Sequence, residues 1–449
     1  MLKPFLRVLS SNEARDRLKG FTRLDRENIS ICDALFRVVG EPMRAPEDVP
    51  GFDRSTMDGF AVRSVDTFGS SESSPALFNL IGEIAMGEIR DLKLRKGETA
   101  RIWTGGALPP NADAVVMIEH TEQVDQNTVE ILKAVAPFDN VIRKGEDFKS
   151  GETLLQPGHR LRAQDLGLLA AMGRAEITVY RKPRVALISS GDEIVPIEET
   201  PLPGCMRDVN RHTLSAMIAD AHATPVWIGI APDNLAALTS MIEKGLNSAD
   251  LVVISGGSSM GSRDHVIEAI SRHDNSEILV HGVSVSPGKP LILGRVDSRA
   301  VVGLPGHPVS AMVCFQQFVV PLIRRLEGEE SSHPFLSPTI RASLSRNVAS
   351  KEGRMDFVRV RLQKKEKKLT AVPVPGKSGM VSAMVRAHGY ITIEPDCEGL
   401  YKGDTVTVHM FSNWMEEVLE KEYLSGHEAA GRSPGRILTT SQQEKLSRT

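Results

Sequence analysis

Carboxylate side chains lie in four short, glycine-containing segments of the chain, two of them outside the predicted α/β domain, where a surface loop of mixed charge is the simpler alternative. Asp58 lies in STMDGFA, Asp147 in IRKGEDFKSG, Glu193 in SSGDE and Asp264 at the end of SGGSSMGSRD. Acids clustered beside an anion site favour Mg²⁺, which prefers oxygen ligands and bridges to phosphate. The alternatives are solvated loop acids and, for Asp264 and Asp233, helix N-caps.

A glycine-rich loop, SGGSSMG (255–261), follows an apolar run. Its glycines would let backbone N–H groups approach an anionic ligand, and its serines would add hydroxyl donors, whereas a tight turn alone is the simpler alternative. The loop matches neither G-x-G-x-x-G nor G-x-x-x-x-G-K-[ST], which argues against a dinucleotide site and a P-loop. Its candidate binding residues are Gly256, Gly257, Ser258 and Ser259.

Two further polar residues follow Pro-Gly pairs. Lys289 in SPGKP could contact phosphate as a point charge. His307 in LPGHP is interpreted as an ordinary residue at the start of a helix. No Ser/His/Asp order and no activated cysteine stands out, so covalent catalysis is not supported.

The chain from Lys182 onward predicts a regular scaffold for these loops. Strands are predicted at 184–190, 224–230, 249–255, 289–296 and 300–304, and helices at 210–222, 233–247, 265–271 and from near His307. This alternation favours a central, doubly wound α/β domain with a mainly parallel sheet. Ligands of such sheets bind beyond the carboxyl ends of the strands, where SSGDE, APD, SGGSSMG and LPGHP would lie.

The remaining segments predict a multidomain α/β protein. Residues 1–45 show helical patterns, including one over 31–35, and 46–150 form a β-rich insertion. A helical linker, RAQDLGLLAAMG, has its start marked by Asp165 and its stop by Gly173. Residues 337–411 indicate an all-β, barrel-like or sandwich domain, followed by a helix, NWMEEVLEKEYL, and a disordered tail after Ser425. The predicted domains are 1–180, 181–328, 335–412 and 413–449.

Composition narrows the classes of partner. The 449 residues carry a net charge of −3, which favours neither nucleic acid nor a membrane surface. Four distant cysteines predict free thiols in a reducing cytoplasm rather than disulfides or a zinc site. The N-terminal stretch lacks the apolar core of a signal peptide, and no run of 18 apolar residues predicts a transmembrane helix.

Eight segments in order resemble the molybdopterin molybdenumtransferase family, of the MoeA type and related to the E domain of gephyrin. They are STMDGFA, TGGALPPNADAVV, RKGED, SSGDE, the glycine-rich loop ending in Asp264, PGKP, LPGHPVS and GRMDFVRVRL. The resemblance implies an elongated homodimer whose central domain is related to the molybdopterin adenylyltransferase fold. It implies that the enzyme inserts molybdenum from molybdate into adenylylated molybdopterin and releases AMP, with Mg²⁺ as the divalent cation. Molybdopterin adenylyltransferase and acceptor molybdoenzymes are the implied protein partners.

The resemblance also assigns roles to residues. The matching positions are Asp58, Thr104, Arg143, Asp147, Glu193, Asp233, Asp264, Pro305, Pro308, Arg354 and Ser378. Asp58, Asp147, Glu193 and Asp264 are the implied catalytic acids, and Glu193 and Asp264 the implied metal ligands. The glycine-rich loop and Lys289 would hold the pterin or phosphate end. Planar guanidinium groups at Arg143 and Arg354 suit molybdate or phosphate.

The chain departs from the family pattern where oxyanion binding is expected. Ser286 replaces the basic residue that often precedes PGKP, HGVSV just upstream has no lysine, and GGSSMG replaces the common GGVSVG. His281 or Lys289 could compensate for the missing lysines. The alternatives are a non-catalytic molybdopterin-binding or scaffolding paralogue and a tungstate-specific paralogue. Adenylylation of molybdopterin is a weaker alternative, because it would leave the flanking β-rich parts without a role.

Overall fold

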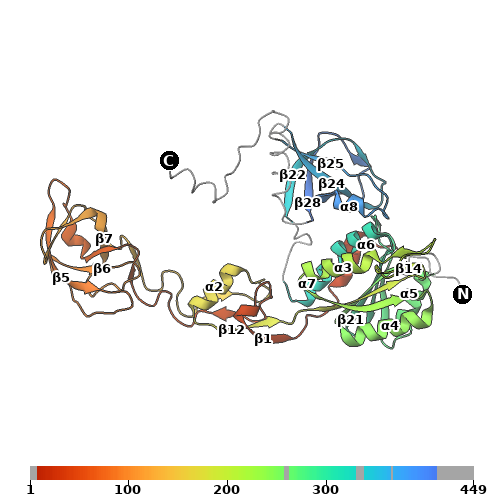
Figure 1. Ribbon diagram of the computed structural model, residues 1–449, viewed down its shortest axis with the longest axis horizontal. Coiled ribbons are helices and arrows are strands. Elements are labelled where there is room, and N and C mark those ends of the chain that lie inside the picture. The colour runs from red at the N-terminus through yellow and green to blue at the C-terminus, as the bar shows by residue number, and fades with distance from the viewer. Residues whose placement is uncertain (1–7, 257–261, 330–337, 366–367, 412–449) are drawn as a thin grey trace, which may run out of the picture. The chain divides into compact units, whose positions relative to one another are not determined.

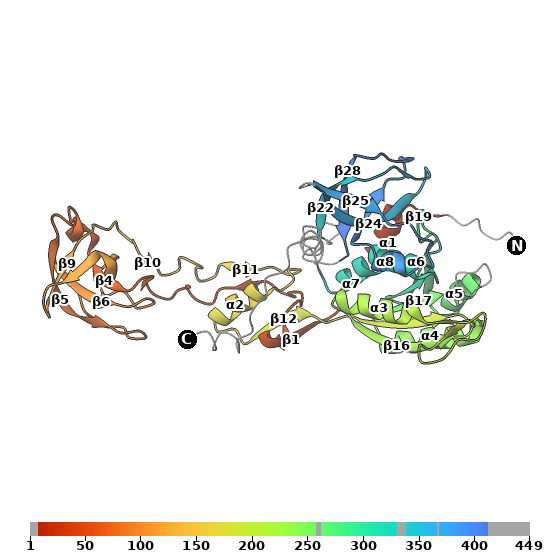
Figure 2. The ribbon, with the colours of Figure 1, turned by 45° about the horizontal axis from the view of Figure 1, so that its top comes forward.

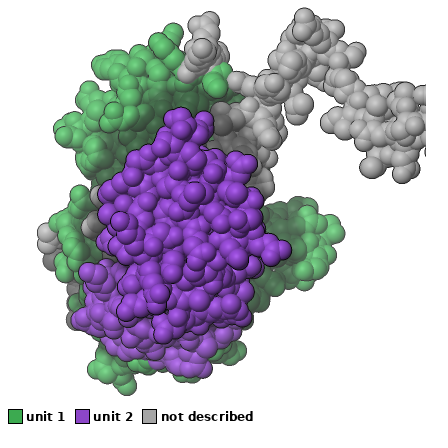
Figure 3. Space-filling view, turned by 90° about the vertical axis from the view of Figure 1, so that its left-hand side faces the viewer, with its two compact units in different colours: residues 1–25, 181–449 green, residues 26–180 purple. Residues whose placement is uncertain are grey.

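The computed structural model describes residues 8–256, 262–329, 338–365 and 368–411. They form two compact units, one of residues 26–180 and one that joins residues 8–25 to the described residues after Tyr180 (Figure 3). The compact unit therefore differs from the predicted range 1–180. The reason is that helix α1 (Ser11–Leu18) buries Ala14 and Leu18 in the core of the α/β domain.

The β-rich insertion within 26–180 is a six-stranded sheet. Its strand order is β7-β4-β6-β5-β9-β8, and only β5 and β6 run parallel. Phe60 and Val62 are buried on one face of β4 and Ala61 on the other, so this strand is covered on both sides. The strands are β4 (Gly59–Val62), β5 (Ala76–Ile84), β6 (Glu98–Ile102), β7 (Ala114–Met117), β8 (Thr121–Gln123) and β9 (Thr128–Ile131).

The helical linker in the same unit differs from the prediction at its edges. Helix α2 (Ala163–Ala171) starts before Asp165, whose carboxylate accepts a hydrogen bond from the Arg162 N–H at 2.8 Å. Gly173 ends the helix as predicted, with a φ of +66°. The unit also contains β2 (Met43–Arg44), β11 (Thr153–Leu155) and the antiparallel pair β1 (Arg26–Ser30) and β12 (Glu176–Tyr180).

The helix expected over 31–35 is wrong. Only a single 3-10 turn forms, at Ile31–Asp33. Phe36 has a φ of +63°, and its N–H bonds to the Leu161 carbonyl at 2.9 Å, so the chain turns away from a helical path.

A six-stranded sheet forms the centre of the α/β domain, and the mainly parallel sheet is confirmed. Its strand order is β16-β13-β17-β21-β20-β18, with the first four strands parallel. Strand β18 was not predicted, and β20 begins later than expected. The strands are β13 (Arg184–Ser190), β16 (Thr224–Ala231), β17 (Leu251–Gly256), β18 (Ser276–His281), β20 (Ile292–Val296) and β21 (Arg299–Leu304).

Helices cover both faces of this sheet (Figures 1 and 2). Val185 and Leu187 of β13 pack toward α3 (Val209–Asp220), whereas Ala186 and Ile188 pack toward α4 (Leu235–Ser248) and α5 (Ser262–Ser271). Successive side chains of a strand point to opposite faces, so one apolar strand supplies both cores. A small parallel pair, β14 (Ile194–Val195) and β15 (Met206–Arg207), extends from the end of β13.

The last helical run of the α/β domain is apolar on nearly all sides. It consists of α6 (Pro308–Cys314), a π turn (Phe315–Val319) and α7 (Val320–Leu326). By length and composition alone the run could cross a membrane, but 72% of that window is buried inside the protein. Burial in the core of this domain explains its composition.

The C-terminal β domain forms a closed barrel. Its strands follow the order β24-β25-β22-β28-β26, and β26 pairs back onto β24. A short strand of the α/β domain, β19 (Val285–Ser286), adds to β24 in parallel. The barrel strands are β22 (Thr339–Leu344), β24 (Met355–Lys365), β25 (Lys368–Pro373), β26 (Gly389–Ile393) and β28 (Thr405–Met410). The predicted last helix and tail lie outside the described residues.

Candidate functional site

Asp58 and Thr104, two of the predicted site residues, are in direct contact. Gly59 of β4 pairs with Ile102 of β6, which places the residue before one strand beside the residues after the other. The Asp58 carboxylate accepts hydrogen bonds from the Thr104 N–H and from its hydroxyl, both at 2.8 Å. These bonds, the backbone one first, lower the pKa of Asp58. Asp58 is therefore an exposed, ionised acceptor rather than a proton donor at neutral pH.

The RKGED loop is held in the same unit by backbone contacts. Strand β10 (Val141–Ile142) pairs with β3 (Arg54–Ser55), and the Asp147 N–H bonds to the Val49 carbonyl at 3.1 Å. The Arg143 guanidinium lies 3.5 Å from the Glu146 carboxylate and 5.0 Å from the centre of the Phe138 ring. The Arg143 N–H and side chain also lower the pKa of Glu146. Arg143 and Asp147 are both exposed.

One segment joins these two loops. The Ser55 carbonyl accepts from the Gly105 N–H at 2.8 Å, and the Ser55 N–H donates to the Gly106 carbonyl at 2.9 Å. Because Ser55 also pairs with Val141, the STMDGFA, TGG and RKGED segments lie together. Three motifs that are far apart in sequence thus form one polar surface in residues 26–180.

A second group of predicted residues lies at the carboxyl edge of the parallel strands. The Ser190 hydroxyl donates to Asp233 at 3.2 Å, and the Asp233 N–H donates to the Asp192 carboxylate at 3.0 Å. Capping does not explain Asp233, because Asn234 is the N-cap of α4 and accepts from the Ala237 N–H at 2.9 Å. The loops after β13 and β16 are therefore connected through their acids.

The glycine-rich loop is described only at its first glycine. A Cβ on Gly256 would lie 2.0 Å from the Ser190 carbonyl oxygen, so the strand can approach β13 this closely only with glycine. Gly257, Ser258 and Ser259 lie outside the described residues. Helix α5 begins at Ser262, which places Asp264 inside its first turn rather than ahead of it; the Asp264 side chain is not described.

The acids described at this edge would supply only some of the ligands of a bound cation. The Glu193 carboxylate is exposed and lies against Gly191, where a Cβ would meet its Oε2 atom at 2.5 Å. Among the described residues, no group of three His, Cys, Asp or Glu side chains could hold a metal ion. Oxygen donors of this kind suit Mg²⁺, which commonly takes one or two carboxylates and completes its shell with substrate phosphate and water.

Two residues at the start of α3 were missed by sequence reasoning. Asp208 is the N-cap and accepts from the Arg211 N–H at 3.0 Å. The Asn210 amide donates to the Ser255 hydroxyl at 2.6 Å and to the Gly306 carbonyl at 2.8 Å, and so joins the loops after β17 and β21. An Asp before a helix is a recognisable capping signal. Asn210 has no comparable signal, because its partners are distant in sequence.

Ser286 and Arg354 both lie next to Asp356, where the barrel joins the α/β domain. Ser286 of β19 is paired with Asp356 of β24. The buried Asp356 carboxylate lies 2.9 Å from the Arg354 guanidinium and accepts from the Ser350 hydroxyl at 2.9 Å. The Asp356 carboxylate thus orients Arg354. Lys289, three residues after Ser286, is exposed.

Ser378 of the barrel lies on the LPGHP loop. Its hydroxyl is 2.9 Å from Nδ1 of His307, and its carbonyl accepts from the Val309 N–H at 3.0 Å. The structure therefore brings Ser378 beside the loop that contains Pro305 and Pro308. His307 directly precedes α6, as expected, but its side chain makes no capping bond to the helix. It contacts the barrel instead, which the sequence did not indicate.

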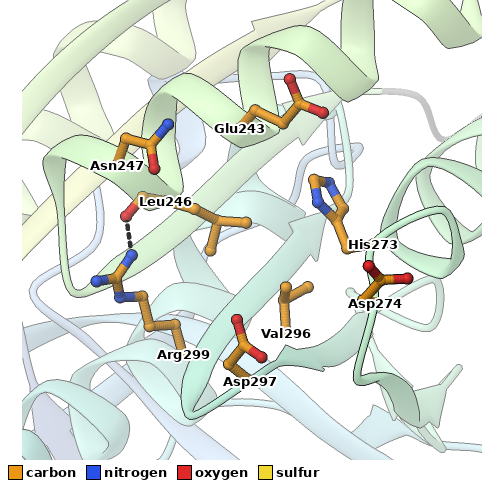
Figure 4. A pocket seen from close by; sticks show the side chains of 8 residues that line it. All are labelled: Glu243, Leu246, Asn247, His273, Asp274, Val296, Asp297 and Arg299. Atoms are coloured by element: carbon orange, nitrogen blue, oxygen red, sulfur yellow. Dashed lines mark hydrogen bonds between the residues drawn. The ribbon is translucent and has the colours of Figure 1, made fainter.

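A cavity of about 240 Å³ lies elsewhere in the α/β domain (Figure 4). It is formed by the end of α4, the segment after α5 and the turn between β20 and β21. Its lining residues are Glu243, Leu246, Asn247, His273, Asp274, Val296, Asp297 and Arg299. These belong to the edge of the sheet where β21 begins, so the cavity is distinct from the carboxyl-edge group.

Known proteins match this arrangement along most of the chain. Three family models match in order: the MoeA N-terminal region (domain I and II) over 9–173, the probable molybdopterin binding domain over 186–325 and the MoeA C-terminal region (domain IV) over 341–411. Two crystal structures of molybdopterin biosynthesis MoeA proteins from Pyrococcus horikoshii are similar. One has a TM-score of 0.75 at 37% identity and covers 91% of this chain. The other has a TM-score of 0.77 at 27% identity and covers 90%. Both neighbours are covered over 100% of their length.

Curated relatives agree with these matches. The molybdopterin molybdenumtransferase of Haemophilus influenzae is 32% identical over 389 residues, which cover 86% of this chain and 94% of that protein. The molybdopterin molybdenumtransferase of Bacillus subtilis is 31% identical over 406 residues, which cover 88% of this chain and 94% of that protein. With its fold, its ordered motifs and these full-length matches, the chain belongs to the molybdopterin molybdenumtransferase family.

Proposed function

We propose that this chain inserts molybdenum from molybdate into adenylylated molybdopterin and releases AMP. The observation that carries the proposal is the convergence of Asp233, Glu193 and Gly256 at one sheet edge with the His307 loop that contacts Ser378. Ligands of open α/β sheets bind at this edge. The names of the curated relatives support the same reaction.

In this proposal the oxyanion binds near the junction of the barrel and the α/β domain. Lys289 is exposed and supplies a point charge. Arg354 is fixed on one side by Asp356, and a guanidinium held in this way still has other N–H donors for an oxyanion. The Ser378 hydroxyl adds a neutral donor. This set would compensate for the serine at position 286.

The adenylylated end of the substrate would lie along the carboxyl edge. Gly256 ends β17 at this edge, and Gly257, Ser258 and Ser259, which follow it, are the proposed donors of the loop. Glu193 and Asp264 are the proposed ligands of a divalent cation, Mg²⁺. When bound, the cation would withdraw charge as the phosphoanhydride breaks and AMP leaves.

The polar surface of residues 26–180 is the second proposed contributor. Asp58 contacts Thr104 there, and the loop with Arg143 and Asp147 is joined to the same segment through Ser55. Arg143 is suited to an oxyanion. We propose that the enzyme is a homodimer that acts in the cytoplasm. The exposed or partly exposed Cys32, Cys205 and Cys397 are free, as is the buried Cys314, which suits a reducing compartment.

The test is AMP release from adenylylated molybdopterin with molybdate and tungstate titrated separately in the presence of Mg²⁺. Release driven by low molybdate would support the proposal. Release with tungstate only would show a tungstate-specific enzyme. Binding of the adenylylated pterin with no AMP release in either titration would contradict the transferase and favour a scaffolding protein.

A further inference from the structure

The contact between His307 and Ser378 links two domains at the candidate site. We propose that His307 is a positioning residue, which holds the Ser378 hydroxyl in the orientation needed to donate to the oxyanion substrate. The identity of that oxyanion as molybdate rests on the proposed function. The residue acts through Ser378 and needs no contact with the substrate itself.

The loop that contains Ser378 is held from both the barrel and the α/β domain. It runs between the end of β25 at Pro373 and the start of α8 (Ser382–Val385), and it contains no regular element. The Arg359 guanidinium donates to the Gly376 carbonyl at 2.7 Å from within the barrel. Toward the α/β domain, Ser378 has the backbone bond from Val309 and the side-chain bond to His307. Helices α6 and α8 lie side by side in both ribbon views (Figures 1 and 2).

The backbone of His307 is restricted by the residue that follows it. Pro308 follows it directly, and a residue before proline is restricted to extended conformations. His307 accordingly has a φ of −66° and a ψ of 126°. Pro308 in turn begins a helix that is buried in the core, so this anchor is rigid. The imidazole carried by this backbone can orient the Ser378 hydroxyl through its hydrogen bond.

The hydrogen-bond chemistry determines what the contact can do. If Nδ1 donates to the Ser378 oxygen, the hydroxyl hydrogen is left to donate to an anion; if Nδ1 accepts, that hydrogen is used. The first arrangement gives the site a directed donor. With Ser286 in place of a basic residue and Arg354 shared with Asp356, such a neutral donor gains importance.

The experiment compares full-length His307→Leu, His307→Asn and Ser378→Ala proteins with the unsubstituted chain. Leucine removes the hydrogen bond, whereas the asparagine amide can replace Nδ1 as a donor. We expect His307→Leu and Ser378→Ala each to raise the half-saturating molybdate concentration of AMP release about tenfold, and kcat to change by less than about threefold. Asparagine should restore the value to within about threefold. The double variant should be no worse than Ser378→Ala alone.

Two further measurements keep the inference separate from the proposed function. Molybdate binding by calorimetry should weaken in His307→Leu, and hydrogen exchange of residues 374–380 should become faster. His212→Leu, at an exposed residue of α3, is the matched control. It should change neither molybdate binding nor hydrogen exchange. If the unsubstituted chain bound molybdate without releasing AMP, the proposed function would fail while the positioning role would still be judged by binding and exchange.

Three results would overturn the positioning role. Unchanged molybdate binding in His307→Leu would overturn it, whether or not hydrogen exchange of residues 374–380 becomes faster. Failure of asparagine to rescue would show that the hydrogen bond is not the cause. Absence of molybdate binding by the unsubstituted chain would remove the oxyanion site itself.

Discussion

The polar surface of residues 26–180 is held together by antiparallel strand pairing, whereas the carboxyl-edge group of the α/β domain meets because parallel strands end at one place. Asp58 and Thr104 lie next to the paired strands β4 and β6. Thr104 donates both of the hydrogen bonds that the Asp58 carboxylate accepts. Asp233 and Asp192 come from different βα units, and Asn210 and Ser378 reach this edge from still more distant elements. The first surface therefore depends on strand register, and the second depends on side-chain contacts between loops.

The largest expected effects come from glycines that allow close backbone approach in each region. A Cβ at Gly59 would lie 1.9 Å from the Val116 carbonyl oxygen, and one at Gly256 would lie 2.0 Å from that of Ser190. Both oxygens belong to paired strands and cannot move freely. Alanine at either position should lower the free energy of unfolding by about 3 kcal/mol, measured by urea denaturation.

A matched glycine separates crowding from backbone strain. Gly105 has a φ of +84° and nothing within 4 Å of an added Cβ. Gly105→Ala should cost only about 1 kcal/mol, since strain alone remains. If Gly256→Ala were no worse than Gly105→Ala, the close approach of β17 to β13 would not be a constraint.

The next effect tests the proposed Mg²⁺ site at the carboxyl edge. Glu193→Gln removes the charge of a proposed ligand and keeps its shape, so AMP release should fall about 100-fold at low Mg²⁺. A higher Mg²⁺ concentration should recover part of the loss. Glu198→Gln, at an exposed acid of the same segment, is the control and should retain activity. Equal loss in both variants would point to general charge rather than to a ligand.

Contacts between distant loops explain why much of this site could not be predicted from the sequence. Strands such as 184–190 are apolar runs bounded by proline or glycine, and these were located correctly. The pattern over 31–35 was misleading because Phe36 and Leu161 turn the chain through a tertiary bond. Strand β18 lies at an edge of the sheet and buries only one of its six residues, so its pattern is weak.

The candidate site residues also divide into those with a local signal in the sequence and those defined by tertiary contacts. Acids in glycine-rich loops could be picked out because residue type and loop position are local signals. Asn210 and His307 could not be assigned their contacts, because their partners lie 45 and 96 residues away for Asn210 and 71 residues away for His307. Nothing local distinguishes such side chains from ordinary polar residues at a helix start.

A smaller effect tests the link made by Asn210. Asn210→Ala removes the hydrogen bonds to Ser255 and Gly306, which should lower the free energy of unfolding by about 1 to 3 kcal/mol. AMP release should fall about tenfold, because the loops after β17 and β21 lose their common donor. Asn247→Ala, at an exposed position of α4, is the control. Full activity in Asn210→Ala would show that these loops keep their positions without it.

The smallest effect concerns the ionisation of Asp58 in the other region. Thr104→Val removes the hydroxyl donor but keeps the backbone N–H, which is the larger cause of the lowered pKa. The pKa of Asp58 should therefore rise while staying below the ordinary value of 3.8. A carboxylate with a depressed pKa stabilises the folded state above its unfolded pKa, and this stabilisation is lost as pH falls through the folded pKa. Because Asp58 is exposed, the sensitive measurement is a carboxyl NMR titration between pH 2 and 6, with Thr104→Ser as the variant that keeps the donor.

AMP release should show no acid limb from Asp58 between pH 5 and 8. An Asp58 pKa that is the same in Thr104→Val and the unsubstituted chain would mean that the backbone bond alone holds this carboxylate, and strand register would then account for the whole contact.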